Sequence, residues 1–580
     1  MDRIFRIKFS HCICVTVVLL FYNEAKSQPP HFRNPLDIPI QLAANFGEIR
    51  ADHYHTGYDI RTNEKIGYAV HAAADGYISR IKVSPYGYGN VIYITHPNGY
   101  MTVYGHLDHF NDAIGKFVKE QQYTKQSFEV ELFPDASKFP VKEGDIIAYS
   151  GNSGSSEGPH LHFEIRDAHG ETYPLNPEKF LPVEDHERPR FHSLFFYDPG
   201  QFGNEDTAIE VFKVVSTDST SHLQKSNNHP AIIGLDSIEV DEPTIELGVE
   251  AEDILQKSSN GIYKLTAALD GKTFFSMKMD RLDFANGRYV NAHLDYHALM
   301  KNHNEVQRLF ILPGDHDDVY DSIVNYGKIQ LKDTMFHLVR ITATDDAGNG
   351  SSLQFNIKYS GKNLQENLPP SSSSVFHFQQ ENSFRNDSMK LEVPAGALYD
   401  DLYFQYSKTD SGSGNYFSAI NHVHDPFTPI HKSCELNLLP RKIPDSLKSK
   451  AIIVYRNSRG TLSGKTTSWN GNSLTAKILN FGDYFVMLDT TPPVLTPVAL
   501  RQNQRVAANQ ISFMCADNLS GISKYNAYLD GKWLLMEYDA KNNRMICRLD
   551  DSLVPGNHVL KIVVSDQVNN ESRYILHFKK

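Results

Sequence analysis

Two stretches of this chain repeat one another, and the repeat limits the folds that the chain can adopt. Gly261–Lys272 (GIYKLTAALDGK) matches Gly521–Lys532 (GISKYNAYLDGK), and His337–Asn349 matches His558–Asn570. Both regions alternate strand-like runs with Gly, Asp and Asn turns, a pattern typical of a β-sandwich. The first copy carries an insertion of about forty residues between its two matching blocks. Because 580 residues are too many for one core, we predict an all-β, multidomain chain.

Both copies resemble immunoglobulin-like (Ig-like) domains of the bacterial kind, in which a Gly-Ile strand, an L-D-G-K hairpin and a closing strand before D-x-x-x-N recur. A Pro/Ser tract at 369–374 indicates a linker between them. The predicted parts are a signal peptide (1–27), a first domain (28–185, with an insertion at 107–140), an Ig-like β-sandwich with an insertion (186–360), a linker (361–374), a β-rich middle domain (375–489) and a C-terminal Ig-like β-sandwich (490–580).

The N-terminal segment has the pattern of an export signal. Arg3, Arg6 and Lys8 precede an apolar run, Cys12–Tyr22, and Ala25-Lys26-Ser27 offers small residues at a cleavage site. The run is too short for a stable membrane anchor, and no later run approaches the roughly 18 residues that one requires. We therefore expect a mature chain without a transmembrane anchor, exported to the periplasm, the cell surface or the medium.

Charge and cysteine content exclude some classes of partner. The formal charge is -12 and no basic tract is present, so neither nucleic acid nor an anionic membrane is expected as a partner. Only Cys434, Cys515 and Cys547 follow the predicted signal peptide, which is not a disulfide framework. Whether Cys515 and Cys547 pair stays open at this stage.

The stretch from Ser150 to Asp167, SGNSGSSEGPHLHFEIRD, predicts a Gly/Ser loop that leads into a strand. Because side chains alternate across a strand, His160 and His162 are expected to share one face. Two imidazoles side by side indicate a metal site, or a metal with a proton carrier. An alternative is two unrelated histidines on a half-exposed strand.

A second polar cluster lies upstream. His55-Thr56-Gly57-Tyr58-Asp59 is an H-x-G-x-D sequence, in which the glycine allows a sharp turn so that the imidazole and the carboxylate can converge. His, Asp and one more His form the three-ligand set, with an open fourth position, that a catalytic zinc requires. Hairpin-like strands follow, and one of them places His106 at its end.

Taken in order, H-x-G-x-D, AAADG, GNVIYITH with YGHL, and GDIIAYSGNSGSSEGPHLHFE resemble the LytM/lysostaphin-type zinc metallopeptidases, which cut peptide bridges of the bacterial cell wall. The resemblance runs from about Gln41 to Pro182 and implies an antiparallel β-sheet metallopeptidase domain. It also implies one zinc ion per chain and peptidoglycan as the substrate. Carried over residue by residue, His55, Asp59 and His162 would bind the zinc, and His106 and His160 would be the catalytic pair.

Two features depart from the family pattern. His53 forms a second H-x-H with His55, but only His55 has the family's spacing to Asp59. The connection at 107–140 is longer than usual; its first half, Phe110–Gln122, has helical spacing, and we expect it to form one wall of the cleft. In the middle domain, His422, His424, Asp425, His431 and Cys434 have no regular metal-ligand spacing, and a structural role is preferred.

The sequence therefore favours an exported zinc endopeptidase that cuts cross-links or stem peptides of peptidoglycan, with the sandwiches as spacers or as docking modules for other envelope proteins. One alternative is a non-enzymatic regulator of other wall hydrolases, since some members of the family have lost their ligands; all five polar positions are present here. A further alternative is a secreted protease that acts on proteins.

Overall fold

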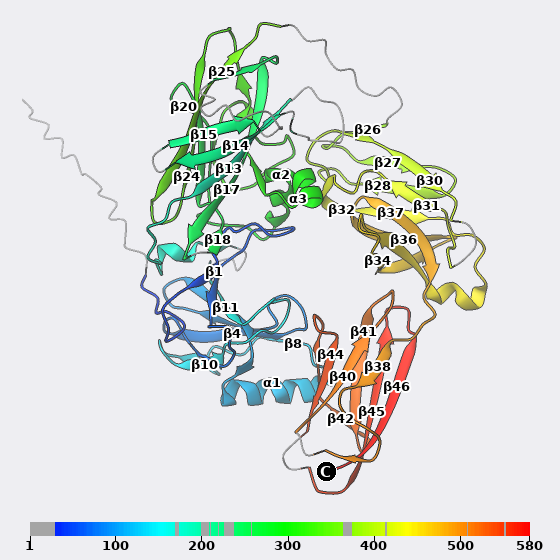
Figure 1. The fold of residues 1–580 in the computed structure, drawn as a ribbon. Helices are drawn as coiled ribbons and strands as arrows, with labels where there is room; N and C mark the ends of the chain where they lie inside the picture. Colours follow the sequence, from blue (N-terminus) through cyan, green and yellow to red (C-terminus); the bar gives the residue numbers. More distant parts are fainter. Residues whose placement is uncertain are drawn as a thin grey trace, which may run out of the picture.

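A computed structural model describes residues 30–168, 173–198, 208, 210–217, 220–225, 237–256, 258–362, 374–411, 415–506, 509–549 and 553–580. The predicted signal peptide, 1–27, lies outside these residues, as does most of the predicted linker, 361–374. Figure 1 shows four parts arranged as a ring, in which the C-terminal sandwich lies beside the helix α1 of the N-terminal part. Within the described ranges, no helix is long and apolar enough to cross a bilayer.

The N-terminal domain consists of two sheets and one long helix. A nine-stranded sheet has the order β1-β2-β11-β6-β5-β4-β8, with β12 beside β11 and β9 beside β4, and a three-stranded sheet has the order β3-β10-β7. The elements are β1 (Leu42–Ala44), β2 (Tyr58–Arg61), β3 (Ala69–His71), β4 (Gly76–Val83), β5 (Asn90–Thr95), β6 (Tyr100–Leu107), β7 (His109–Phe110), α1 (Asp112–Lys125), β8 (Val130–Leu132), β9 (Pro140–Val141), β10 (Ile146–Tyr149), β11 (His160–Asp167), β12 (Pro174–Leu175) and η1 (Pro177–Lys179).

The alternation within β11 connects the fold to the site. Leu161, Phe163 and Ile165 are fully buried in the core of the N-terminal domain. Because successive side chains of a strand point to opposite faces, the polar residues between them point to the other face. The apolar face anchors the strand, and the polar face is left for chemistry.

Helix α1 forms within the predicted insertion, close to the predicted span. The side chain of Asn111 caps its first turn by accepting a hydrogen bond from the backbone N–H of Ile114, and Gln126 ends it in a left-handed conformation. Ile114 and Val118 bury one face of the helix against the domain core.

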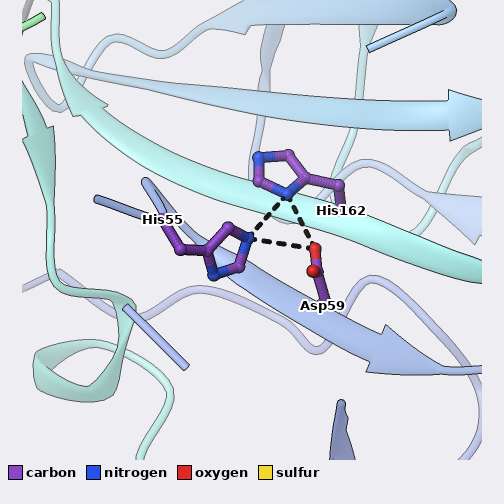
Figure 2. A group of neighbouring side chains, drawn as sticks. All are labelled: His55, Asp59 and His162. Atoms are coloured by element: carbon purple, nitrogen blue, oxygen red, sulfur yellow. Dashed lines mark hydrogen bonds and ion pairs between the residues drawn. The ribbon is translucent and has the colours of Figure 1, made fainter. Parts of the chain in front are cut away.

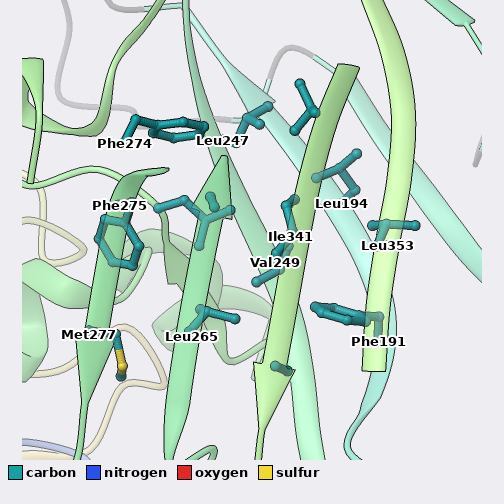
Figure 3. Packing of buried hydrophobic residues seen from close by; sticks show 14 of the residues in the cluster. Phe191, Leu194, Leu247, Val249, Leu265, Phe274, Phe275, Met277, Ile341 and Leu353 are labelled. Atoms are coloured by element: carbon teal, nitrogen blue, oxygen red, sulfur yellow. The ribbon is translucent and has the colours of Figure 1, made fainter. Parts of the chain in front are cut away.

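The first sandwich follows the N-terminal domain. Its sheets have the orders β15-β14-β13-β17-β18, with β21 and β23 beside β17, and β16-β25-β24-β19-β20-β22. The elements are β13 (Arg190–Tyr197), β14 (Glu210–Thr217), β15 (Thr220–Lys225), β16 (Ser237–Val240), β17 (Thr244–Leu255), β18 (Ser258–Asn260), β19 (Lys264–Leu269), β20 (Lys272–Lys278), η2 (Gly287–Tyr289), α2 (Val290–His293), α3 (Tyr296–Asn302), β21 (Val306–Arg308), β22 (Tyr320–Ile323), η3 (Asn325–Gly327), β23 (Ile329–Gln330), β24 (His337–Thr344) and β25 (Gly350–Tyr359). Figure 3 shows residues of both sheets, among them Leu194, Val249 and Ile341, packed in one core.

The middle domain has a two-stranded sheet, β26-β29, and two five-stranded sheets, β27-β28-β32-β36-β35 and β30-β31-β37-β33-β34. The elements are β26 (Ser374–Phe376), β27 (Asn382–Arg385), β28 (Met389–Val393), β29 (Leu402–Phe404), β30 (Tyr406–Thr409), β31 (Ile420–Val423), β32 (Pro429–Leu438), η4 (Asp445–Lys450), β33 (Ala451–Arg456), β34 (Leu462–Lys465), β35 (Thr467–Asn470), β36 (Ser473–Asn480) and β37 (Gly482–Leu488).

The C-terminal sandwich repeats the strand order of the first. Its sheets have the orders β38-β40-β44-β43 and β39-β46-β45-β41-β42, and the second of these corresponds to β16-β25-β24-β19-β20. In both sandwiches the first strand of that order pairs in parallel with the second. The elements are β38 (Val494–Pro497), β39 (Gln504–Arg505), β40 (Gln510–Ala516), β41 (Ile522–Leu529), β42 (Lys532–Leu534), β43 (Met536–Asp539), β44 (Arg544–Arg548), β45 (Asn557–Asp566) and β46 (Glu571–Lys579). Cys515 and Cys547 are buried and free.

Candidate metal centre

Two neighbouring strands bring the predicted ligands together. In the antiparallel pairing of β2 with β11, Asp59 lies directly opposite His162. Side chains directly opposite each other share a face and approach closely. His55 precedes β2 and reaches the same point, as Figure 2 shows. The structure therefore places His55, Asp59 and His162 in one group that could hold a metal ion.

The donor atoms of these three residues converge. The Nε2 atom of His55 lies 3.1 Å from Oδ1 of Asp59 and 3.1 Å from Nδ1 of His162, and the latter two atoms are 2.8 Å apart. All three residues are buried. Two imidazole nitrogens and a carboxylate oxygen within this distance form a donor set that suits zinc.

The glycine of H-x-G-x-D, Gly57, allows the backbone of its loop to approach the backbone of β11 closely. Gly57 does not have a positive φ, but a Cβ atom there would lie 2.3 Å from the carbonyl oxygen of Phe163. Any larger residue would push the loop away from β11. The chain bends at this glycine, as expected, and the absence of a side chain also lets the His55 loop lie directly against the neighbouring strand.

Each ligand imidazole is oriented by a hydrogen bond at the ring nitrogen that does not face the donor group. Nδ1 of His55 lies 2.6 Å from the carbonyl oxygen of Asn45, so it carries the proton and leaves Nε2 for a metal. His162 has the reverse arrangement, because its Nε2 lies 2.8 Å from the fully buried carboxylate of Glu164. That carboxylate also accepts hydrogen bonds from Tyr88 and Thr56. Such outer partners fix the ring orientation and the basicity of a metal ligand.

Charge in the metal-free site is balanced by protons. Burial opposes ionisation of Asp59, but the imidazoles around it hold the pKa of its carboxyl well below the usual range. Burial lowers the pKa of His162, while the bonds to Asp59 and Glu164 raise it, with a net result of about 9. Without a metal, His162 therefore carries an extra proton near neutral pH. A bound cation would replace that proton.

His106 and His160 lie beside the group with their rings 4.8 Å apart. Nδ1 of His106 lies 2.9 Å from the carbonyl oxygen of Ser153, and Nδ1 of His160 lies 2.9 Å from that of Gly158. Both rings therefore donate through Nδ1 and keep Nε2 as an acceptor. Nε2 of His160 is 3.3 Å from Oδ1 of Asp59, is buried, and has no hydrogen-bond partner within the described chain.

The backbone at His106 is unusual. Its φ is 57°, in the left-handed region that residues other than glycine rarely adopt. Such strain is typical of positions where surrounding structure holds a functional side chain in place. Burial and the neighbouring imidazoles lower the pKa of His106 to about 3, so its ring is neutral at physiological pH.

The five residues line a groove of about 1040 Å³. Arg50 also lies in it and forms ion pairs with Glu48 and with Asp59, 3.2 and 3.3 Å long. His53 also lines the groove but is not part of the donor group, and it bonds to Asp52 with a mostly exposed ring. The groove also includes Phe284 of the first sandwich.

The insertion forms a different surface from the one expected. Residues of α1 do not line the groove around the five polar residues; Gly115, Val118 and Gln122 line a separate hollow shared with the C-terminal sandwich. The expectation that the insertion walls the metal cleft is therefore wrong. The helix instead contacts the distal domain, with Tyr123 packed edge-on against Trp533 at 5.1 Å.

The first sandwich holds the loop that carries His55. Phe46 and Tyr54, both nearly fully buried, belong to the hydrophobic core of that sandwich. The side chain of Asn45 exchanges two hydrogen bonds of 2.9 Å with the backbone of Gly261. Because the carbonyl of Asn45 in turn orients His55, this sandwich supports the metal centre from outside.

The C-terminal sandwich contacts the loop before β11. The ammonium group of Lys541 donates to the side chain of Asn152 at 2.9 Å and to the carbonyl oxygen of Ser156 at 2.6 Å, and it also bonds to the backbone carbonyl of Asn152. Ser156 in turn bonds to Gly158, whose carbonyl orients His160.

The other histidine-rich segment does not form a metal group. Within the described residues, His422, His424, Asp425, His431 and Cys434 do not converge on one point. His422 pairs with Asp483, and His431 stacks on Tyr289. A structural role stays the prediction for these five residues.

The sequence did not single out Glu164, Tyr88, Thr56 or Arg50. The period of two in HLHFEIRD carries a signal for one of them, because it places Glu164 on the face of His160 and His162. The other three come from loops, and their positions depend on tertiary structure.

Comparison with known proteins identifies two parts of the chain. The family described as peptidase family M23 matches residues 53–125, and the family described as Zu5-like domain matches residues 373–489. The chain thus carries an M23 domain of LytM type, whose matched segment contains His55, Asp59 and His106. The β-rich middle segment corresponds to the Zu5-like match.

Curated relatives are similar to about a fifth to a quarter of this chain. The DD-carboxypeptidase/endopeptidase Mpg of Neisseria meningitidis is 36% identical over 123 residues, which are 21% of this chain and 22% of that protein. The peptidoglycan DD-endopeptidase ShyA of Vibrio cholerae is 31% identical over 139 residues, 23% of this chain and 26% of that protein. The murein hydrolase activator NlpD of Salmonella typhimurium is 34% identical over 142 residues, 24% and 29% respectively.

The chain thus spans about a fifth to three tenths of the length of these relatives. Among solved structures, the catalytic domain of lysostaphin from Staphylococcus simulans is 26% identical and covers 25% of this chain and 93% of its own, with a TM-score of 0.19.

Proposed function

We propose that this chain is an exported zinc metalloendopeptidase that hydrolyses peptide cross-links or stem peptides of bacterial peptidoglycan. The observation that carries the proposal is the convergence of a His-Asp-His donor group with two further imidazoles whose Nε2 atoms are free to act. The M23 match and the relatives named as peptidoglycan endopeptidases support the same reaction class.

The donor set fits zinc. The three buried residues His55, Asp59 and His162 line the groove and would supply three of the four ligands of a catalytic zinc, with water as the fourth. The Nε2 atom of His160, 3.3 Å from Oδ1 of Asp59, lies beside the same donor group. Bound zinc would lower the pKa of a water molecule and polarise the scissile carbonyl.

His160 would act as the general base. Its Nδ1–H bond to Gly158 fixes the tautomer in which Nε2 accepts a proton. The ring lines the groove, and its Nε2 lies 3.3 Å from Oδ1 of Asp59, beside the place where zinc would hold a water molecule. Once protonated, the same nitrogen can return the proton to the leaving amine.

His106 would stabilise charge that develops on the substrate. Its ring is neutral in the free site, and negative charge appearing beside it favours the protonated form. In that form Nε2 donates a hydrogen bond to the oxyanion or a proton to the leaving amine. The carbonyl of Ser153 holds the ring in place through Nδ1 in either form.

A non-enzymatic regulator of other wall hydrolases is the second candidate, because one matched relative is named a murein hydrolase activator. The presence of all five polar residues favours the enzyme. A purified cross-linked muropeptide separates the two: the zinc-loaded chain is expected to cleave it alone, while His160→Ala leaves it intact. A chain that is inert alone but accelerates a second hydrolase would instead be a regulator.

A further inference from the structure

Two groups of three carboxylates lie away from the metal centre, one at the start of each repeated sandwich. In each group, oxygens from all three side chains lie within 4.8 Å of one another. The groups are Asp185, Asp253 and Asp345 in the first sandwich and Asp489, Asp517 and Asp566 in the C-terminal one.

The two groups occupy equivalent places. Asp185 and Asp489 lie in the segments that enter the two sandwiches, before β13 and β38. Asp253 is near the end of β17. Asp517 directly follows β40, the strand of the C-terminal sandwich that corresponds to β17. Asp345 directly follows β24 and Asp566 ends β45, in the repeated D-x-x-x-N sequence.

An asparagine at the same position of the repeat completes each group. In the first sandwich the side chain of Asn349 donates to Oδ2 of Asp345 at 2.9 Å and to the backbone carbonyl of Asp185 at 3.3 Å. In the C-terminal sandwich Asn570 donates to Oδ2 of Asp566 at 2.6 Å and to the carbonyl of Asp489 at 2.9 Å. Each group therefore joins an entering segment to the closing strand of its sandwich.

These carboxylates have no neutralising positive side chain among the described residues. Within the described ranges, none of the six forms an ion pair with Lys, Arg or His, although burying unpaired anions is costly. Burial, followed by the charges of Asp185 and Asp345, raises the pKa of Asp253 to about 7. Burial and the charges of Asp489 and Asp517 raise the pKa of Asp566.

Further oxygens at both places are buried without a partner. Oδ1 of Asp253, a residue 3% exposed, and Oδ1 of Asn260, 4% exposed, have no hydrogen-bond donor in the described chain. Asn260 lies directly opposite Asp253 in the pairing of β17 with β18, so both side chains share one face. A cavity of about 10 Å³ lies there, lined by the three carboxylates and also by Glu178 and Asp346, and it has room for about one small sphere.

The C-terminal sandwich repeats this feature. Oδ1 of Asp517 and Oγ of Ser520 are buried and lack a partner among the described residues. Ser520 is 3% exposed, and its backbone N–H donates to Oδ2 of Asp489 at 3.1 Å. Asn260 and Ser520 both directly precede the repeated Gly-Ile sequence, so the extra oxygen comes from the same position in each copy.

We propose that each of the two groups binds one Ca²⁺ ion, which fastens the entering segment to its sandwich. Ca²⁺ takes six to eight oxygen ligands at about 2.3–2.6 Å, so oxygens on opposite sides of the ion lie roughly 4.8 Å apart. The all-oxygen donor sets fit this ion, whereas zinc prefers the nitrogen-containing set at His55, Asp59 and His162. The proposal does not depend on the reaction at the metal centre.

Calcium binding to the full chain tests the number and place of the sites. The protein is freed of calcium by passage over a chelating resin, reloaded with one equivalent of zinc, and titrated with Ca²⁺ by calorimetry. We expect two calcium ions per chain, one for Asp253→Asn, one for Asp517→Asn, and none for the double variant. Two sites in the double variant, or none in the unaltered chain at millimolar Ca²⁺, would overturn the assignment.

Asp270→Asn with Asp530→Asn serves as the matched control. Asp270 and Asp530 occupy equivalent positions of the repeat. They pair with His337 and His558, at the ends of β24 and β45 that lie away from the proposed calcium sites. The control changes the same residue type in the same two sandwiches, and it is expected to keep both calcium sites.

Thermal melting guards against variants that simply fold poorly. Ca²⁺ is expected to raise the melting temperature of the unaltered chain by several degrees, because it binds only the folded state. Asp253→Asn should melt no lower than the unaltered chain in calcium-free buffer, since it removes repulsion, and should not respond to Ca²⁺ at that sandwich. A variant that is destabilised without calcium and an unaltered chain that does not respond to calcium would show that protein hydrogen bonds alone hold these carboxylates. An equal response to Mg²⁺ would contradict the choice of Ca²⁺.

Discussion

The carboxylate of Glu164 lies 2.8 Å from Nε2 of His162, on the far side of the imidazole from the metal group. This contact makes Nδ1 the atom that His162 offers to a metal. Arg166 bonds to the same carboxylate and is the buried cation that keeps it ionised. The orientation of His162 therefore depends on Glu164 and, through Glu164, on Arg166.

Replacing Glu164 by Gln is expected to weaken zinc binding roughly 10- to 100-fold, the usual scale for loss of an outer partner of a metal ligand. The amide keeps the shape of the side chain but removes its charge. Competition with a chromophoric zinc chelator measures the affinity. An unchanged affinity in a folded variant would show that Glu164 does not orient His162.

The predicted ligands themselves should control zinc content. The mature chain is expected to hold about one zinc ion, and His162→Ala is expected to lose it, because two remaining donors cannot complete a tetrahedral site. His53→Ala is the matched control: this histidine neighbours the first ligand but bonds to Asp52 and is not part of the donor group. Metal analysis of both variants checks this, and full zinc occupancy in His162→Ala would remove the assignment.

The other two histidines should separate chemistry from metal binding. His160→Ala and His106→Ala are each expected to keep zinc and to lower the rate about a hundredfold or more, the scale for loss of a positioned acid or base. Rates on a small bridge peptide and zinc content are measured on the same samples. If His160→Ala lost zinc while His162→Ala kept it, the roles of these two residues would have to be exchanged.

Part of this site could be predicted from the sequence, because strand alternation and a short loop are local. The period of two placed His160 and His162 on one face, whereas His55 was preferred over His53 because only His55 has the spacing to Asp59 of the family that the segment resembles. Strand geometry could not decide which of His160 and His162 is the ligand; that choice came from the family resemblance.

Long-range packing is what the sequence could not supply. Nothing in the pattern around Tyr54 indicates that its ring is buried in the core of the next sandwich. In the same way, the contact of Lys541 with the loop before β11 joins residues 385 positions or more apart. The internal repeat did predict two similar sandwiches, and the matched strand orders agree with it.

Domain truncation tests the division of labour. Every proposed ligand and catalytic residue lies between His55 and His162, so a fragment that ends at residue 362 is expected to bind zinc and hydrolyse small bridge peptides. It should act less well on intact wall, because distal domains that bind wall or a partner raise the local concentration of the catalytic domain. A fragment that ends at residue 185 should be less stable, since Phe46 and Tyr54 lose their burial.

Lys541→Ala in the full chain is the control for this truncation, because it removes the contact with the loop before β11 and keeps the domain. Loss of small-peptide hydrolysis in a folded, zinc-loaded fragment, reproduced by Lys541→Ala, would mean that the distal sandwich completes the active site.

Digestion of purified sacculi by the mature, zinc-loaded chain, with the soluble products identified by mass, tests the proposed endopeptidase activity itself. The account predicts release of muropeptides in which one peptide bond per cut has gained a water molecule, and no release by His160→Ala with equal zinc content. Intact sacculi after incubation with folded, zinc-loaded protein would contradict it.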